Sequence, residues 1–146
     1  MPGYEMWGAE ERREVEEVLE TGILMRYGFD GPRKGRWKAR ELEAALCQRT
    51  GASHAQVVSS GTAALTTALA ALGVGAGDEV VMPTFTFVAS FEAVLSVGAT
   101  PVLADVDDTL TLSPAAVRAA VTPRTKVVMP VHMCGAMADL GALEEL

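Results

Sequence analysis

Small and hydroxylated residues follow a short apolar run near the middle of the chain. Residues 59–62 read Ser-Ser-Gly-Thr, and the alanine-rich run 63–72 comes next. The first turn of a helix has free N–H groups and a partial positive charge, so Ser60, Gly61 and Thr62 could hold a phosphate group. The alternative is an ordinary helix N-cap, which serine and threonine commonly provide. The phosphate-loop pattern GxxxxGK[ST] and the dinucleotide pattern GxGxxG are both absent from the sequence.

Two aromatic residues follow the next apolar run. Residues 83–87 read Pro-Thr-Phe-Thr-Phe. An aromatic ring at the end of a strand can lie flat against a planar ligand, and such stacking contributes on the order of 1 kcal/mol beyond burial. Phe87 is therefore a candidate for contact with a planar ring. Alternatively, Phe87 is the first core residue of the helix that follows.

Acidic and nucleophilic residues elsewhere give weaker signals. Residues 105–108 read Asp-Val-Asp-Asp, but their spacing fits no EF-hand loop, and acidic residues after a strand are common turn formers. We therefore expect no metal site. His132 is expected to contact a ligand or a neighbouring residue at the end of a strand. A serine hydrolase that uses Ser59 or Ser60 is disfavoured because the GxSxG elbow is missing.

Alternating apolar segments predict the elements that position these residues. Strand and helix patterns alternate four times with short connections, which is typical of an α/β fold with a mostly parallel sheet and helices on both faces. Ligands of such sheets bind at the carboxyl ends of the strands, where the candidate residues lie. The predicted strands are 55–58, 79–82, 100–104 and 126–131, and the predicted helices are 9–20, 37–48, 61–72, 86–97, 114–120 and 138–146.

Apolar residues recur at helical spacing in the predicted helices. In the first helix, Val15, Val18 and Leu19 mark one face, which we expect to be buried. The second helix shows the same pattern. Its expected inward residues are Leu42, Ala45 and Leu46, and in helix 86–97 the expected apolar face consists of Phe87, Phe91, Val94 and Leu95.

Length and composition narrow the function classes. The chain has 146 residues, 49% of them hydrophobic and 21% charged, which is a globular composition. The net charge of −7 disfavours nucleic acid as a partner. The apolar runs are shorter than the 18 or so residues that a membrane span needs. Cys47 and Cys134 lie far apart in the sequence, so we expect reduced thiols and a cytoplasmic protein.

Half of the lysines and arginines are concentrated between residues 26 and 40. The loop 27–35 inside this segment is rich in glycine and separates an N-terminal arm, 1–36, from a predicted α/β domain, 37–146. We expect Arg36 and Arg40 to pair with Glu41 or Glu43 on a solvated helix face. Arg33 and Lys34 lie in the loop, as does Arg26 at its start, so these cations are candidates for binding an anionic group.

Six motifs occur in an order that is specific to one family, although each motif alone is modest. Together they resemble the DegT-type pyridoxal-5′-phosphate (PLP) dependent sugar aminotransferases, from Pro2 to about Asp139. The resemblance implies the N-terminal part of the large PLP-binding domain of a fold-type-I enzyme. The motifs are Ser-Ser-Gly-Thr-Ala-Ala-Leu, Gly-Val-Gly-Ala-Gly-Asp-Glu-Val-Val, Pro-Thr-Phe-Thr-Phe-Val-Ala-Ser, Gly-Ala-Thr-Pro-Val-Leu-Ala-Asp-Val-Asp, Thr-Pro-Arg-Thr-Lys and Pro-Val-His-Met-Cys-Gly.

The resemblance also implies roles for individual residues. Ser60, Gly61 and Thr62 would hold the phosphate of PLP, Phe87 would stack on its pyridine ring, and His132 would lie near the top of the pocket. The stretch around residues 26–38 is similar to a narrower branch, the transaminases that make 8-amino-3,8-dideoxy-octulosonate, a sugar of lipopolysaccharide biosynthesis. On that comparison, the substrate-binding residues would include Tyr27, Arg33, Lys34 and His132.

The lysine that binds PLP and the aspartate that contacts its pyridine nitrogen come later in the family than residue 146. The lysines present are Lys34, Lys38 and Lys126, and we expect none of them at the carboxyl ends of the strands. The chain would then contain no catalytic residue and would not transaminate alone. The family implies an amino-acid donor, a keto or aldehyde sugar as acceptor, and a homodimer. A non-catalytic phosphate-ligand or interaction module remains the alternative.

Overall fold

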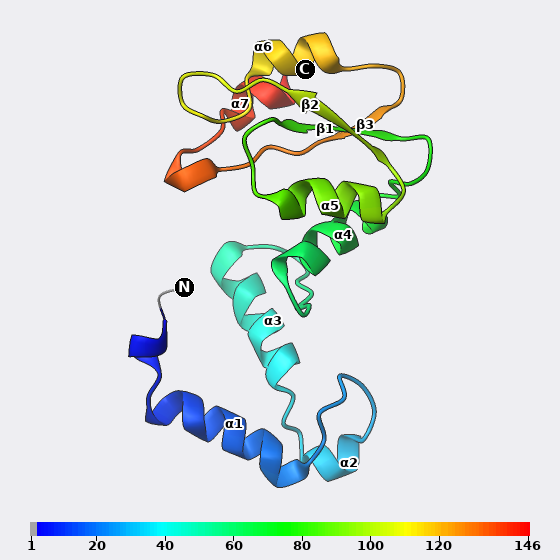
Figure 1. Cartoon of the computed structure of the whole chain (residues 1–146). Helices are drawn as coiled ribbons and strands as arrows, with labels where there is room; N and C mark the ends of the chain where they lie inside the picture. Colours follow the sequence, from blue (N-terminus) through cyan, green and yellow to red (C-terminus); the bar gives the residue numbers. More distant parts are fainter. Residues whose placement is uncertain (1–2) are drawn as a thin grey trace. The chain divides into compact units, whose positions relative to one another are not determined.

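A computed structural model of the protein describes residues 3–146 and divides the chain into two compact units (Figure 1). The N-terminal unit ends at Val57, and the sheet unit comprises Val58–Leu146. The sequence predicted the boundary at residue 36, but the division falls later. The helix that follows residue 37 belongs with the N-terminal unit because ion pairs tie it to the first helix.

The N-terminal unit consists of helices and a loop. Both long helices lie within two residues of their predicted ends, and each ends at a glycine in the left-handed region, Gly22 with φ 66° and Gly51 with φ 76°. Glycine adopts this conformation without steric cost, which explains why the helices end there. The elements are η1 (Tyr4–Met6), α1 (Ala9–Thr21), α2 (Asp30–Arg33) and α3 (Lys38–Thr50).

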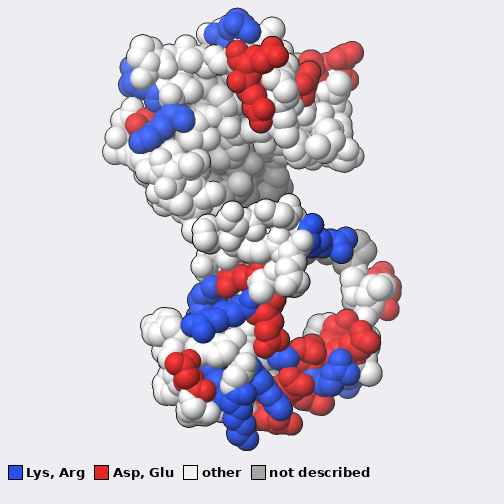
Figure 2. Space-filling model, turned by 180° about the vertical axis from the view of Figure 1, so that it is seen from behind, with Lys and Arg blue, Asp and Glu red and all other residues white. Residues whose placement is uncertain are grey.

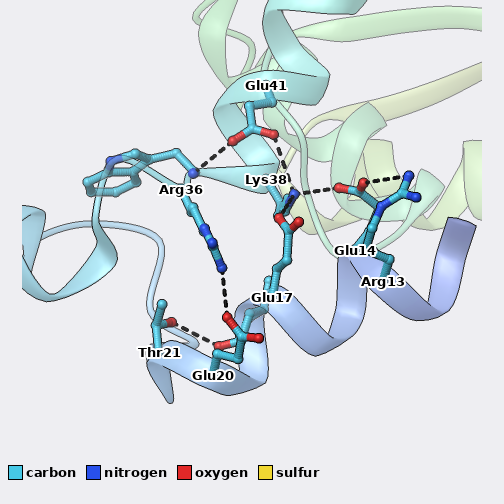
Figure 3. A network of polar contacts seen from close by, with 10 residues as sticks. Arg13, Glu14, Glu17, Glu20, Thr21, Arg36, Lys38 and Glu41 are labelled. Atoms are coloured by element: carbon cyan, nitrogen blue, oxygen red, sulfur yellow. Dashed lines mark hydrogen bonds and ion pairs between the residues drawn. The ribbon is translucent and has the colours of Figure 1, made fainter.

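An ionic network joins α1 to α3 (Figure 3). The Nζ atom of Lys38 lies 2.5 Å from a carboxylate oxygen of Glu14 and 2.7 Å from one of Glu17. Arg36 Nη1 is 2.9 Å from Glu20 Oε2. Lys38 donates hydrogen bonds to Glu14 and Glu17. The bond to Glu14, followed by that to Glu17, raises the pKa of the Lys38 amine, and the bond from Lys38 lowers the pKa of Glu17. Charge pairing therefore holds the two helices together.

The apolar faces predicted for α1 and α3 are not buried in this unit. Val15 is 46% exposed, Leu19 63% and Leu42 49%. Two helices and a loop enclose too little volume to cover these side chains, because small units bury only a modest fraction of their surface. The expectation that both faces point inward is thus wrong for the N-terminal unit itself.

The sheet unit has the predicted α/β architecture. Three parallel strands lie in the order β2-β1-β3, and helices cover both faces of the sheet (Figure 1). This confirms the fold class expected from the alternating pattern. The elements are α4 (Gly61–Ala71), β1 (Glu79–Pro83), α5 (Val88–Ser96), β2 (Thr100–Ala104), α6 (Pro114–Ala120), β3 (Thr125–Val128), η2 (Met133–Gly135) and α7 (Leu140–Glu144).

The core lies on the two faces of the central strand β1. Successive strand residues point to opposite faces, so Val80 and Met82 pack against α4 and α5 on one side. Val81 packs with Leu112 and Val117 on the other side, near α6 and α7. All five residues of β1 are buried. This pattern is typical of a parallel strand covered by helices on both faces.

The predicted strand at 55–58 does not form. The backbone N–H of Val57 donates to the carboxylate of Glu43 at 2.7 Å, and its carbonyl accepts from Arg26 at 3.4 Å. These side chains satisfy the backbone groups that a neighbouring strand would otherwise pair. The apolar composition of this segment is strand-like, but its backbone has no strand partner among the described residues.

Glu79 joins the start of β1 to the turn that precedes β3. Its side chain is only 6% exposed. Thr122 donates its hydroxyl to one carboxylate oxygen at 2.5 Å, and Arg124 Nε donates to the other at 2.9 Å. The hydrogen bond from Thr122, followed by those from Arg124, lowers the pKa of Glu79 below its ordinary value of 4.5.

We predict that Glu79 makes the protein sensitive to acid. A lowered folded-state pKa contributes stability that is present above the unfolded pKa and is lost as pH falls through the folded pKa. Glu79→Gln should therefore lower the urea midpoint at pH 7, and the difference from the wild type should shrink below about pH 4. The control is Glu92→Gln, an exposed carboxylate on α5. A difference that does not vary with pH would contradict the prediction.

Candidate functional site

The turn at Ser60 has the geometry of an open helix N-terminus. Ser60 has extended backbone angles, and its Oγ accepts a hydrogen bond from the N–H of Ala63 at 3.1 Å. Ser60 and Gly61 are exposed, and Thr62 is half-buried. A Cβ atom placed on Gly61 would meet no other atom within 4 Å. The interpretation of Ser60 as an N-cap is therefore confirmed. The backbone in front of the serine is accessible, and phosphate binding there stays a prediction.

Two backbone donors and one hydroxyl at this turn remain available to a ligand. The first N–H groups of a helix have no intrahelical partner, and Ser60 satisfies only that of Ala63. The N–H groups of Gly61 and Thr62 also belong to the first turn of α4 and can donate to a ligand, as can the hydroxyl of Thr62. These are the donors that a phosphate or sulfate group needs.

Phe87 is not a core residue of the sheet unit. It directly precedes α5 as its N-cap and is 70% exposed. The buried residues of α5 are Ala89, Ser90, Ala93 and Val94. The interpretation in which Phe87 opens the core face of the helix is therefore wrong. Its ring is free to contact a ligand beyond the end of β1.

His132 follows β3 and is exposed. Its Nδ1 accepts a hydrogen bond from the backbone N–H of Ala138 at 3.1 Å. A ring nitrogen that accepts carries no proton, so the neutral imidazole has its N–H at Nε2. His132 therefore contacts a neighbour through one nitrogen and presents a donor with the other.

The acidic run 105–108 forms a turn. Asp107 Oδ1 accepts from the backbone N–H of Thr109 at 2.9 Å and from its hydroxyl at 2.5 Å. These bonds lower the pKa of Asp107, with the hydroxyl of Thr109 as the largest cause. Within residues 3–146, no group of three or more His, Cys, Asp or Glu side chains is arranged to hold a metal ion.

Phe87 and His132 lie at one edge of the sheet. They follow β1 and β3, which are adjacent and parallel, so their carboxyl ends meet at the same edge. Lys126 lies at the opposite end of β3. Its Nζ donates to the carbonyl of Gly73 at 2.6 Å and to Asp78 at 3.2 Å. The expected position of Lys126, away from the carboxyl ends, is confirmed.

The remaining candidates lie in the N-terminal unit. Tyr27 is 70% exposed, and Lys34 is exposed with φ 53°. Arg33 differs from both because only 7% of it is exposed. Its Nε donates to the carbonyl of Gly28 at 3.0 Å, and its Nη2 donates to the carbonyl of Met25. The guanidinium that we expected to be available to a ligand is thus engaged by the backbone of its own loop.

Half of the cations between residues 26 and 40 form ion pairs within the N-terminal unit. Arg26 pairs with Glu43, and the pairs of Arg36 and Lys38 are those described above. Figure 2 shows the blue cations of this unit lying among red carboxylates. The expected pairing of Arg36 with Glu41 or Glu43 is wrong, since Arg36 reaches back to α1. Lys34 makes no ion pair with any residue between 3 and 146.

Sequence reasoning missed the role of Trp37. The guanidinium carbons of Arg33 and Arg40 lie over its ring, 4.2 and 3.8 Å from the centroid. Arginine contacts of this kind are favourable cation–π interactions. The spacing of Trp37 and Arg40 was a usable signal, because residues three apart at the start of a helix are neighbours. Arg33 precedes that helix, so its contact with Trp37 had no such signal.

None of the helices that the structure describes between residues 3 and 146 is both long and apolar enough to cross a membrane.

Comparisons with known proteins agree with this arrangement of elements. Residues 6–146 match the DegT/DnrJ/EryC1/StrS aminotransferase family. The chain is similar to the crystal structure of 3-amino-5-hydroxybenzoic acid synthase, with 44% identity and a TM-score of 0.87, over 99% of this chain and 36% of that one. It is also similar to DesV from S. venezuelae, with 38% identity and a TM-score of 0.85, over 97% of this chain and 36% of that one.

A third similar structure is the PLP form of a putative sugar aminotransferase from Streptococcus pneumoniae. The identity is 34% and the TM-score 0.76, over 92% of this chain and 33% of that one. The chain therefore spans about a third of the length of the solved structures that it matches. The family match and these structural similarities cover nearly all of the described residues. The chain belongs to the DegT/DnrJ/EryC1/StrS aminotransferase family.

Proposed function

We propose that the full-length enzyme containing these residues transfers an amino group from an amino acid to a keto or aldehyde sugar, with PLP as cofactor. The observation that carries this proposal is the family match over residues 6–146, together with 44% identity to a solved member. The finer proposal for the acceptor is an anionic octulosonate. Its support is the resemblance of residues 26–38 to that branch and the exposed, unpaired Lys34.

The residues of the sheet unit fit the cofactor. The open turn at Ser60 offers the backbone N–H groups of Gly61 and Thr62 to the phosphate of PLP. Phe87 is exposed beyond the end of β1, where its ring can lie against the pyridine face. When bound, PLP withdraws electrons from the substrate carbon and so makes the transfer of the amino group possible.

The other candidates would act on the substrate. His132 can donate a hydrogen bond from Nε2, because Nδ1 is held by Ala138. Tyr27 and Lys34 would contact a sugar in the neighbouring subunit's site, and Lys34 would supply the positive charge for a carboxylate. Arg33 was predicted to share that contact, but its donors are engaged by its loop. We therefore assign Arg33 an indirect role.

We also propose that the intact enzyme is a cytoplasmic homodimer. The support is the family resemblance, which implies that residues 26–37 border the neighbouring subunit's site. Sedimentation velocity of the full-length protein tests this assembly. A fully active monomer would contradict it.

A second candidate function is a non-catalytic module that binds a phosphate ligand or a protein. The observation that favours it is the position of the lysines: Lys126 is bound at the far end of β3, and Lys34 and Lys38 lie in the N-terminal unit. Whether the coding sequence continues past residue 146, with a lysine after a later strand, separates the two functions.

Our first functional prediction concerns the phosphate site. In the full-length enzyme, Thr62→Ala and Ser60→Ala should each weaken PLP binding about tenfold, because hydrogen bonds to charged groups contribute roughly 1.5–3 kcal/mol. Equilibrium dialysis measures the dissociation constant. The matched control is Ser113→Ala, since Ser113 caps α6 through the N–H of Ala116 in the same way. Equal losses of PLP affinity in the Ser60 and Ser113 variants would mean that Ser60 acts only as a helix cap.

Phe87→Ala should also weaken PLP retention. Loss of ring stacking costs about 1 kcal/mol, or roughly a fivefold change in the dissociation constant. The free energy of unfolding without cofactor should change by less than about 0.5 kcal/mol, because Phe87 is mostly exposed. Phe91→Ala serves as the control on the same helix, and PLP affinity should not change in it. A large loss of stability with unchanged PLP affinity would refute the proposed contact.

The main test of the function uses borohydride, which fixes PLP covalently to a lysine that has bound it. Residues 1–146 mixed with PLP should give no stoichiometric label at Lys34, Lys38 or Lys126, as judged by peptide mass spectrometry. The full-length enzyme should carry one label at a different lysine. Stoichiometric labelling of one of these three would overturn our assignment. An unlabelled full-length protein would favour the non-catalytic module.

A further inference from the structure

Arg33 is the one buried cation that the structure describes between residues 3 and 146. Its guanidinium joins two carbonyls of the same loop, those of Met25 and Gly28. A guanidinium is a planar fork with several fixed donors, whereas an ammonium is a single point charge. One side chain thus closes the loop on itself, and lysine could not reproduce that geometry.

The ring of Trp37 holds the same guanidinium from another direction. Arg33 Cζ lies 4.2 Å from the ring centroid, and Arg40 Cζ, in the first turn of α3, lies 3.8 Å from it. The loop is therefore fastened to the start of α3 through Arg33 and Trp37. Both residues line a cavity of ≈ 220 Å³ in the N-terminal unit, together with Met25 and Arg26.

The backbone of residues 25–34, which we term the 25–34 loop, is strained. Phe29 has φ 64° and Lys34 has φ 53°, values that residues with a side chain rarely adopt. Such conformations persist only where the surrounding contacts enforce them, and they cluster at functional sites. The contacts of Arg33 provide this enforcement. Arg33 is the one buried residue of the loop, and Tyr27 and Lys34 are among its exposed residues.

We propose that Arg33 is a positioning residue: through its two carbonyl bonds and the ring of Trp37, it holds the 25–34 loop in the shape that presents Lys34 and Tyr27 to an anionic sugar. The identity of the substrate in this inference rests on the proposed function. The part that concerns the order of the loop is independent of that function. The two parts can therefore be tested separately.

Hydrogen–deuterium exchange of the full-length protein without substrate tests the order of the loop. The N–H of Arg33 donates to the carbonyl of Phe29 and that of Lys34 to the carbonyl of Gly31, so both amides report on it. Arg33→Ala and Arg33→Lys should each speed their exchange about tenfold or more, while α1 and α3 keep their protection. The control is Arg49→Ala on an exposed turn of α3. Unchanged protection in Arg33→Ala would overturn the proposal.

A double-mutant cycle on the full-length enzyme tests the action through Lys34. Arg33→Ala and Lys34→Ala should each raise KM for an anionic keto sugar about tenfold, leave kcat unchanged and leave a neutral analogue unaffected. The KM of the double variant should exceed the higher of the two single-variant KM values by no more than about twofold, because both changes remove the same contact. A purely structural role would instead lower kcat on both substrates.

Two other results would overturn the proposal. A multiplicative loss in the double variant would mean that Arg33 contacts the sugar directly and independently of Lys34. An unchanged KM in Arg33→Ala, despite a loosened loop, would mean that the order of the loop has no bearing on the substrate. If the unmodified enzyme fails to transaminate, the proposed function falls, and the exchange experiment still decides whether Arg33 orders the loop.

Discussion

Strand β1 pairs with a parallel strand on each side, and helices cover both of its faces. The rest of the sheet unit depends on this burial. Because the three strands are parallel, the segments that follow them emerge at one edge, and Phe87 and His132 lie there as a consequence. The opposite end is closed by polar contacts, with Glu79 bound to Thr122 and Arg124. Burial of apolar side chains thus stabilises the sheet. The common direction of its strands decides which end of the sheet is available for chemistry.

The N-terminal unit is stabilised by a different balance of forces. Its helices leave their apolar faces largely exposed, and the contacts between them are ion pairs centred on Lys38. Exposed ion pairs are individually weak, but a network with one lysine between several carboxylates is stronger than isolated pairs. The same charges explain why a segment rich in arginine offers few free cations. A cluster of basic residues in the sequence becomes a binding surface only where carboxylates of the same fold do not already pair with these residues.

Local sequence patterns predicted most helices and strands of the fold. Two predictions that failed concern residues whose backbone or side chain is bound by residues that are not adjacent to them in the sequence. Helix ends and the three paired strands follow from hydrophobic period and glycine positions, which are properties of a few adjacent residues. The segment 55–58 has the composition of a strand, yet Glu43 takes the N–H of Val57. Arg33 gave the opposite error, since a loop position suggested exposure and the structure buries it. The first outcome depends on Glu43, which belongs to another element. The second depends on how the loop folds back on itself, which brings the carbonyls of Met25 and Gly28 to Arg33.

Ser60 and Ser113 show why the same local signal need not mean the same site. Both serines cap a helix through the N–H of the third residue that follows. Pro114 comes after Ser113 and has no N–H, so α6 lacks the first donor that an anion would meet. Gly61 comes after Ser60, keeps its N–H and leaves space in front of it. The cap is of the same kind in both helices, and the identity of the next residue decides whether the helix end can also bind a ligand.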